Sequence, residues 1–314
     1  MRFLQKIQSI EVPLQLIEKM SDTPHKAGYV SIIGKPNVGK STLMNAMVGE
    51  RLSIITSKAQ TTRHRIMGIL SGDDFQIVYS DTPGIIKPEY ELHKSMMSFV
   101  SSSFEDADVI LFVTDLYEKY DNEKQIDFLK SIDVPVLLVM NKVDLAKGSQ
   151  AEDKVAYWKE IIDFDEVVMV SALESLNIDG LFEKIIKLLP EHHAYFPKDT
   201  LTDKPERFFV DECVREKIFL NYKKEVPYSC EVVTTSFKED EKIIRISTDI
   251  YVERKSQKGI IIGHKGEAIK KVGIAARMDL EKFFGKQVFL ETMVKVEEDW
   301  RKKSDKLKRF GYNN

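Results

Sequence analysis

The chain has 314 residues, of which 43% are hydrophobic and 31% charged, and its formal net charge is −3. This length suits about two domains, and no apolar stretch approaches the roughly 20 uncharged residues that a membrane span needs. The slight negative charge argues against a uniformly basic nucleic-acid binder, although an average over two domains can conceal one basic face. Cys213 and Cys230 lack CxxC spacing, so we expect no disulfide framework, no zinc site and a reducing cytoplasm.

The first 27 residues fit neither of the two domains that the remaining sequence predicts. Phe3, Ile7 and Ile10 recur at helical spacing, but Pro13 ends that pattern early. We therefore expect a disordered N-terminal extension over residues 1–27. The alternative is a helix that lies on a membrane surface.

Strands alternate with segments of helical period from Tyr29 to about Leu189. The clearest strands are YVSII, FQIVYSD, DVILFVTD, VPVLLVMNK and EVVMVSA. This alternation predicts an α/β domain over residues 28–190, with a mostly parallel sheet flanked by helices. Pro190, Pro197 and the polar stretch KDTLTDKPE then indicate a linker over 191–205.

The segment GKPNVGKS follows the first of these strands and precedes a helix. In the spacing G-x-x-x-x-G-K-S, backbone N–H groups converge on phosphate oxygens, Lys40 reaches the β- and γ-phosphates, and the Ser41 hydroxyl binds Mg²⁺. A plain strand-to-helix turn would not require the Lys-Ser pair. The predicted phosphate-loop residues are Gly34, Lys35, Pro36, Asn37, Val38, Gly39, Lys40, Ser41 and Thr42.

Two later segments select the base. Asn141-Lys142-Val143-Asp144 ends a strand, where open α/β folds collect ligands, and the Asp144 carboxylate can accept from both N1–H and N2–H₂ of guanine. Adenine lacks that donor pair, so a site committed to it rejects adenine. After the next strand, Val170-Ser171-Ala172 would supply a backbone N–H to guanine O6. The predicted base-site residues are Asn141, Lys142, Asp144, Ser171 and Ala172.

The segment DTPG ends the strand FQIVYS and has the features of a nucleotide switch. Asp81 would hold Mg²⁺ through water, and the Gly84 N–H would contact the γ-phosphate. The predicted nucleotide contacts here are Asp81, Thr82, Pro83 and Gly84. Between this segment and the phosphate loop lies QTTR, in which we favour Thr62 over Thr61 as the hydroxyl that completes the Mg²⁺ shell. The expected metal ligands are therefore Ser41, Thr62 and Asp81, and the catalytic group is Lys40, Thr62 and Gly84.

The residues from 206 onward predict a second, α+β domain with a charged C-terminal helix, in the order helix, strand, strand, a glycine-interrupted helical pair, and strand. Gly263-His264-Lys265-Gly266 interrupts the helical pair and resembles the G-x-x-G loop of a type II KH domain, where the backbone of a nucleic acid comes close to the chain. Lysines around the loop form a predicted positive groove. The expected RNA-binding residues are Lys255, Lys258, Ile262, Gly263, His264, Lys265, Gly266, Lys270 and Lys271.

The nucleotide motifs together resemble those of the translation-factor class of GTPases. Within that class, KAQTTRHRIMGI and the second domain resemble the Era family, over about Gly28 to Tyr312. This resemblance implies a P-loop GTPase domain followed by a type II KH domain at 206–314. It also implies binding to the 3′ end of small-subunit ribosomal RNA during assembly of the small ribosomal subunit.

The resemblance also bears on hydrolysis. Many GTPases place a water-orienting glutamine after the DxxG glycine, whereas Ile85 occupies that position here and cannot polarise water, so we expect slow intrinsic turnover. Asn37 either helps to hold a potassium ion, as in related GTPases, or is a turn residue, and both alternatives stay open. We expect His64 and His93 to be packing or surface residues, and Trp300 to pack the last helix onto its domain.

The sequence thus predicts a Mg²⁺-dependent GTPase switch joined to an RNA-binding domain, acting as a monomer in the cytoplasm. One alternative is a membrane-associated GTPase, peripheral at the inner face of the cell membrane, whose C-terminal domain binds protein. A second is a non-enzymatic RNA-binding module that holds GTP structurally.

Overall fold

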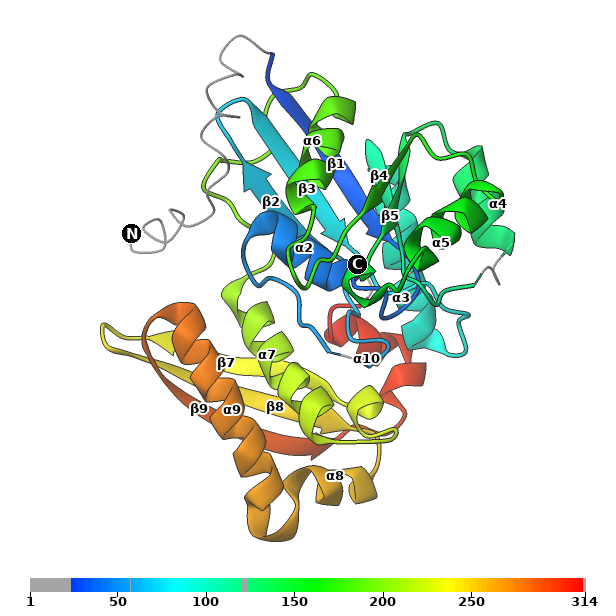
Figure 1. Cartoon of the computed structure of the whole chain (residues 1–314). Coiled ribbons are helices and arrows are strands. Elements are labelled where there is room, and N and C mark those ends of the chain that lie inside the picture. The colour runs from blue at the N-terminus through cyan, green and yellow to red at the C-terminus, as the bar shows by residue number, and fades with distance from the viewer. Residues whose placement is uncertain (1–23, 57, 120–122, 313–314) are drawn as a thin grey trace. The chain divides into compact units, whose positions relative to one another are not determined.

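A computed structural model describes residues 24–56, 58–119 and 123–312 (Figure 1). The predicted N-terminal extension lies outside the described residues up to position 23, and the first strand begins at Lys26. Within the described part of the chain, no helix is both long and apolar enough to cross a membrane.

The chain separates into two compact units whose borders do not follow the sequence in single blocks. The first contains residues 24–53, Arg65–Ile85 and Phe99–Asp203, and the second contains Ile54–His64, Ile86–Ser98 and the chain from Lys204 onward. Two segments that the sequence places inside the GTPase domain therefore pack with the C-terminal part of the chain.

The first unit is built on a six-stranded sheet with the order β2-β3-β1-β4-β5-β6. Its strands are β1 (Lys26–Ile33), β2 (Ile66–Ser71), β3 (Phe75–Asp81), β4 (Val109–Thr114), β5 (Val136–Met140) and β6 (Glu166–Met169). All neighbours are parallel except β2 and β3. The mostly parallel sheet is confirmed, while the antiparallel edge strand β2 was not among the predicted strands.

Helices cover both faces of this sheet, as the apolar runs of its central strands require. They are α2 (Lys40–Val48), the part of α3 (Glu91–Glu105) from Phe99 onward, α4 (Glu123–Ser131), α5 (Gln150–Lys159) and α6 (Ile178–Leu188). One core joins β1, β4 and β5 to α4 and α5, with Phe112 and Trp158 in edge-to-face contact at 5.0 Å between ring centroids. Because every central strand is buried on two sides, the polar ends of the strands are the places left for a site.

The second unit contains a three-stranded sheet with the order β7-β8-β9. The elements are α7 (Glu206–Asn221), β7 (Glu231–Glu239), β8 (Ile243–Val252), α8 (Lys255–Ile262), α9 (Glu267–Phe284), β9 (Gln287–Val296) and α10 (Ser304–Arg309), with short 3₁₀ turns η4 (Pro227–Ser229) and η6 (Trp300–Lys302). β7 is antiparallel to β8, and β9 is parallel to it. The predicted order of helices and strands is confirmed.

In this unit α7 and α9 lie side by side on one face of the sheet (Figure 1). Their apolar faces form a core with β8 and β9, in which Val214, Ile218, Ile250, Val272 and Ala276 are completely buried. This packing fixes the turn between α8 and α9 at one end of the sheet.

Candidate functional site

The phosphate loop connects β1 to α2 through two glycines with positive φ. Gly34 has φ 146°, and a Cβ there would lie 2.2 Å from the Val113 carbonyl oxygen, so no other residue fits. Lys40 lies beneath the loop, where its Nζ donates to the carbonyl oxygens of Gly34 at 3.1 Å and Lys35 at 2.9 Å. Burial lowers the pKa of Lys40 to about 8. An anion at this loop would stabilise the charged ammonium.

Two predicted metal ligands meet at the start of α2. The Ser41 hydroxyl donates to Asp81 Oδ2 at 2.6 Å, and the Ser53 hydroxyl donates to the same oxygen at 2.9 Å. Asp81 is fully buried, and hard oxygen donors of this kind suit Mg²⁺. The third predicted ligand, Thr62, belongs to the second unit, so its role stays a prediction. Ser53 was missed because a lone serine after a helix carries no sequence signal.

The DTPG segment lies against the phosphate loop. A Cβ on Gly84 would lie 2.6 Å from the Pro36 backbone nitrogen, so this close approach requires glycine. The following backbone N–H, that of Ile85, donates to the Gly34 carbonyl oxygen at 3.2 Å. Thr82 anchors the other end, because its hydroxyl donates to the Ile32 carbonyl oxygen at 2.9 Å. The segment is thus positioned beside the predicted phosphate site.

Asn141 connects the phosphate loop to the base-reading segment. Its Nδ2 donates to the Val38 carbonyl oxygen at 2.9 Å, and its Oδ1 accepts from the Ala172 N–H at 3.0 Å. Lys142 adds a second bridge, from its Nζ to the Asn37 carbonyl oxygen at 2.6 Å and to Asp115 Oδ2 at 2.8 Å. Three motifs that are far apart in sequence therefore share one network.

The groups predicted to bind guanine differ in whether they already have a hydrogen-bond partner within the protein. The Asp144 side chain is exposed within the turn Val143–Leu145. The Ser171 N–H donates to the Leu176 carbonyl oxygen, and the Ala172 N–H donates to Asn141. A backbone donor to guanine O6 from this segment therefore stays a prediction.

Two acids after β4 also belong to this site and were not predicted. Asp115 accepts from Lys142, as described, and Glu118 is 9% exposed. Burial raises the pKa of Glu118 to about 7, against the charges of Lys35 and Lys40. The sequence could have indicated them by their position just after a central parallel strand, since ligands bind at that edge of an open sheet.

In the second unit, the G-x-x-G turn joins α8 to α9 through three residues with positive φ. Gly263 has φ 73°, Lys265 has φ 48° and Gly266 has φ 81°. A Cβ on Gly263 would lie 2.5 Å from the Ala268 Cβ, whereas one on Gly266 would meet nothing within 4 Å. The turn therefore presents a bare backbone, beside which an RNA backbone can approach.

The residues predicted to bind RNA lie on this turn and on the helices α8 and α9 to either side of it. Lys255, His264, Lys265, Lys270 and Lys271 are exposed, Lys258 is half-buried, and Ile262 packs partly against the core. None of the five lysines forms an ion pair with another residue of the described ranges. Their charge is therefore available to a phosphate backbone.

Three residues outside the site behave as the sequence indicates. His64 stacks on Tyr312 with 4.3 Å between ring centroids, and His93 stacks on Tyr90 at 3.8 Å. Trp300 is fully buried and contacts Phe310 edge-to-face at 5.5 Å. The described residues contain no cluster of His, Cys, Asp and Glu that would hold a metal ion.

Two family models match the chain, one in each part. Residues 29–142 match a family described as 50S ribosome-binding GTPase, and residues 225–301 match the KH domain. These ranges contain the phosphate loop and the G-x-x-G turn respectively.

Relatives match over nearly the whole chain. GTPase ERA1, chloroplastic, from Zea mays is 47% identical over 92% of this chain and 71% of its own length. GTPase Era from Staphylococcus epidermidis is 42% identical over 92% of this chain and 98% of its own length.

Two crystal structures share the fold. One is an Era variant from Aquifex aeolicus bound to GDP and aluminium fluoride, with a TM-score of 0.88, 39% identity, and coverage of 92% of this chain and 100% of that one. The other is Era in complex with MgGDPNP and nucleotides 1506–1542 of 16S ribosomal RNA, with a TM-score of 0.86 and the same identity and coverage.

Proposed function

The chain belongs to the Era family of GTPases, and we propose that it hydrolyses GTP as a molecular switch that binds the 3′ end of small-subunit ribosomal RNA and acts in assembly of the small ribosomal subunit. Within the first unit, the Asn141 network carries this proposal, because it joins a phosphate loop to a guanine-reading segment. A KH domain in the same chain supplies the RNA-binding half.

The described residues suggest how the nucleotide is held. In this proposal the exposed carboxylate of Asp144 accepts from guanine, Lys40 contacts the β- and γ-phosphates, and Ser41 and Asp81 hold Mg²⁺, with Thr62 as the further ligand. Bound Mg²⁺ would neutralise charge that develops on the transferred phosphoryl group.

Turnover without a partner is slow in this proposal. Ile85 packs partly against the core of the first unit and offers no polar atom from its side chain to a water molecule. Catalysis then depends on Lys40, the metal and backbone donors such as the Gly84 N–H, which contribute by positioning and electrostatics.

We also propose potassium as a further cofactor, held with the help of Asn37. The Asn37 side chain is exposed and its φ is 67°. Asparagine adopts this left-handed conformation more readily than most residues, which equally supports a role in the turn alone.

The RNA half of the function belongs to the turn at Gly263–Gly266 and its lysines. A KH groove clamps about four nucleotides of single strand, and the bare turn and exposed cations fit a phosphate backbone. We place this activity in the cytoplasm and in a monomer. Both cysteines are free thiols, in keeping with a reducing compartment.

Asp144→Asn tests the guanine assignment. The carboxylate accepts two hydrogen bonds from guanine, so its loss should weaken GTP binding about 100-fold or more and shift preference to xanthosine triphosphate, which replaces the N2 donor with an acceptor. Competition of both nucleotides against a fluorescent GDP measures the preference. Asp163→Asn, at an exposed position of the same unit, is the control. A variant that keeps the native preference for GTP contradicts the assignment.

A further inference from the structure

The segment Ile54–His64 precedes β2 in the chain, yet it is an integral part of the second unit. We propose that Arg63 is a positioning residue that fixes this segment to the KH domain, so that the KH domain determines where Thr62 lies. The proposal rests on the function proposed above, because the position of Thr62 affects turnover only if the chain hydrolyses GTP.

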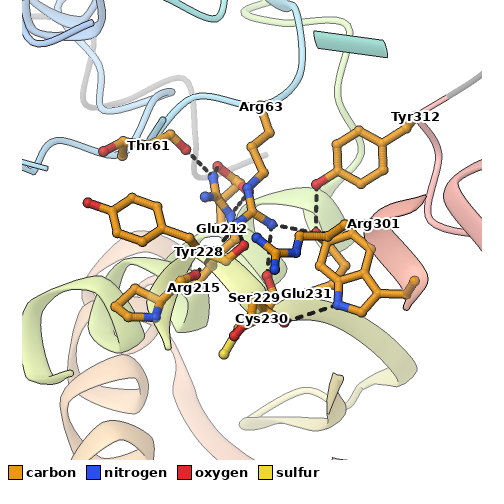
Figure 2. Close-up of polar contacts among 12 residues, drawn as sticks. Thr61, Arg63, Glu212, Arg215, Tyr228, Ser229, Cys230, Glu231, Arg301 and Tyr312 are labelled. Carbon is orange, nitrogen blue, oxygen red and sulfur yellow. Dashed lines mark hydrogen bonds and ion pairs between the residues drawn. The ribbon is translucent and has the colours of Figure 1, made fainter. Parts of the chain in front are cut away.

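Arg63 is held in the second unit by its guanidinium group. Its side chain is 1% exposed, and its Nη1 donates to Glu231 Oε2 at 2.9 Å and to the Cys230 carbonyl oxygen at 2.8 Å (Figure 2). Its Nη2 donates to the Tyr228 carbonyl oxygen at 2.9 Å. A guanidinium with this many fixed partners cannot be replaced by lysine without loss of the fork geometry.

The C-terminal end of the chain completes the pocket around Arg63. The Tyr312 hydroxyl donates at 2.6 Å to the same Glu231 oxygen that pairs with Arg63, and the Trp300 ring centroid lies 5.8 Å from the Arg63 Cζ. Trp300 is itself fixed by its Nε1, which donates to the Ser229 carbonyl oxygen at 3.0 Å. Residues about 240 positions later in the chain therefore hold Arg63 in place.

Arg215 on α7 supplies a second anchor. Its Nη2 donates to the Thr61 carbonyl oxygen at 2.5 Å, and its Nε donates to Glu212 Oε1 at 2.7 Å (Figure 2). Both Arg215 and Glu212 are buried, so this contact is shielded from water.

Two further contacts hold the beginning of the segment to the same helix. The Ile55 N–H donates to Glu216 Oε1 at 3.3 Å. The Lys58 ammonium donates to the carbonyl oxygens of Phe219 and Tyr222. A cation at this end of α7 is favoured by the helix dipole and by carbonyls that have no partner within the helix.

These anchors determine the position of Thr62. It lies between Thr61 and Arg63, both of which are held, and the residue is itself buried, with 8% of its surface exposed. Because consecutive Cα atoms are about 3.8 Å apart, Thr62 cannot move far while its two neighbours stay bound.

The chain passes from the anchored segment into the first unit within two residues of Arg63. Arg65 belongs to that unit, where its Nε donates to the Ser80 hydroxyl at 2.6 Å and its Nη1 pairs with Asp106 at 2.6 Å. Only His64 separates Arg65 from Arg63. When RNA moves the KH domain, the QTTR segment therefore has to move with it, because only His64 connects Arg63 to the first unit at Arg65.

Tyr312→Phe tests the proposal, because it removes one hydrogen bond to the Glu231 carboxylate and no charge. We expect amide hydrogen exchange over residues 54–64 of the full chain to become about tenfold faster, since a hydrogen bond to a charged group contributes at least one factor of ten. We also expect the ratio of GTP turnover with and without RNA to fall towards one, while RNA affinity stays within about twofold.

Tyr251→Phe is the matched control. Tyr251 lies in the same unit, is buried, and donates from its hydroxyl to Asp249 at 3.2 Å, but no hydrogen bond or ring contact joins it to the described residues of the segment 54–64. It should change neither the exchange of that segment nor the turnover ratio.

The pair Arg63→Met and Glu231→Gln, made singly and together, gives a second measurement. Each single variant should speed amide exchange over residues 54–64 by some factor relative to the native chain. If the two residues act through each other, the factor for the double variant should be smaller than the product of the two single factors.

The proposal is overturned if Tyr312→Phe leaves exchange over residues 54–64 unchanged. It is also overturned if exchange rises while the turnover ratio keeps its native value. If the native chain shows no GTP turnover, or none that RNA changes, the proposed function fails instead, and the exchange measurement alone decides whether Arg63 positions the segment.

Discussion

Gly39→Ala should damage nucleotide binding through the base-reading motif rather than through the phosphate loop alone. Gly39 has φ 98°, and a Cβ there would lie 2.2 Å from Asn141 Nδ2. The Asn141 amide would have to move, which breaks its hydrogen bonds with the Val38 carbonyl oxygen at 2.9 Å and the Ala172 N–H at 3.0 Å.

The size of the effect follows from these contacts. The left-handed backbone costs about 1–2 kcal/mol for alanine, and two buried polar groups left without partners cost about 1–3 kcal/mol each. The sum is about 3–8 kcal/mol, and its lower end already corresponds to a loss of affinity for GTP of about 100-fold or more if the first unit stays folded and the whole cost falls on binding. Part of the cost will also appear as a lower free energy of unfolding.

Fluorescent GDP binding and thermal unfolding of the full chain measure the two parts. Gly148→Ala is the control, because Gly148 lies in the same unit with φ 56° and a Cβ there would meet nothing within 4 Å. It should cost about 1 kcal/mol of stability and leave affinity unchanged. If Gly39→Ala binds GTP within threefold of the native chain and unfolds like the control, the reasoning about Asn141 is wrong.

Three other predictions concern charge, RNA and potassium. Burial raises the pKa of Glu118 to about 7 and lowers that of Lys40 to about 8. Because bound phosphates favour the protonated form of both groups, GTP affinity should fall as pH rises through 7 and 8. Glu118→Gln should abolish the fall in affinity near pH 7, and a variant with the native profile of affinity against pH contradicts this. Gly263→Asp should weaken RNA binding at least tenfold in a filter-binding titration without changing RNA-free GTP turnover, whereas Gly285→Asp, at another left-handed glycine of that domain, should not. If Asn37 helps to hold potassium, turnover should rise when potassium replaces sodium at fixed ionic strength, and a flat response removes that role.

Local sequence patterns were enough to predict the helices and strands whose type depends on residues close to them in the chain. In the second domain, α7 (Glu206–Asn221) and β9 (Gln287–Val296) occupy the first and last places in the predicted order of helices and strands. The phosphate loop was recognisable because its chemistry requires fixed residues at fixed spacing. β2 was missed because it begins directly after QTTRHR, a segment that was interpreted only as a nucleotide contact.

The sequence could not show which contacts form between distant residues. Arg63 lies in a motif that was assigned to the nucleotide, whereas its partner Glu231 is 168 residues later. The sequence predicted a charged C-terminal helix but not its partners, and in the structure Arg301 forms an ion pair with Glu253 and Lys306 forms one with Glu297. A run of like charges does not reveal that acids elsewhere in the fold are placed to meet it.

GTP turnover with and without a single-stranded RNA copied from the 3′ end of small-subunit ribosomal RNA, at constant salt, tests the central claim most directly. The account predicts slow turnover alone and stimulation by this RNA, and no stimulation by an RNA of the same length and unrelated sequence. Bound RNA that leaves turnover unchanged would contradict a single RNA-sensing switch and would indicate two independent modules.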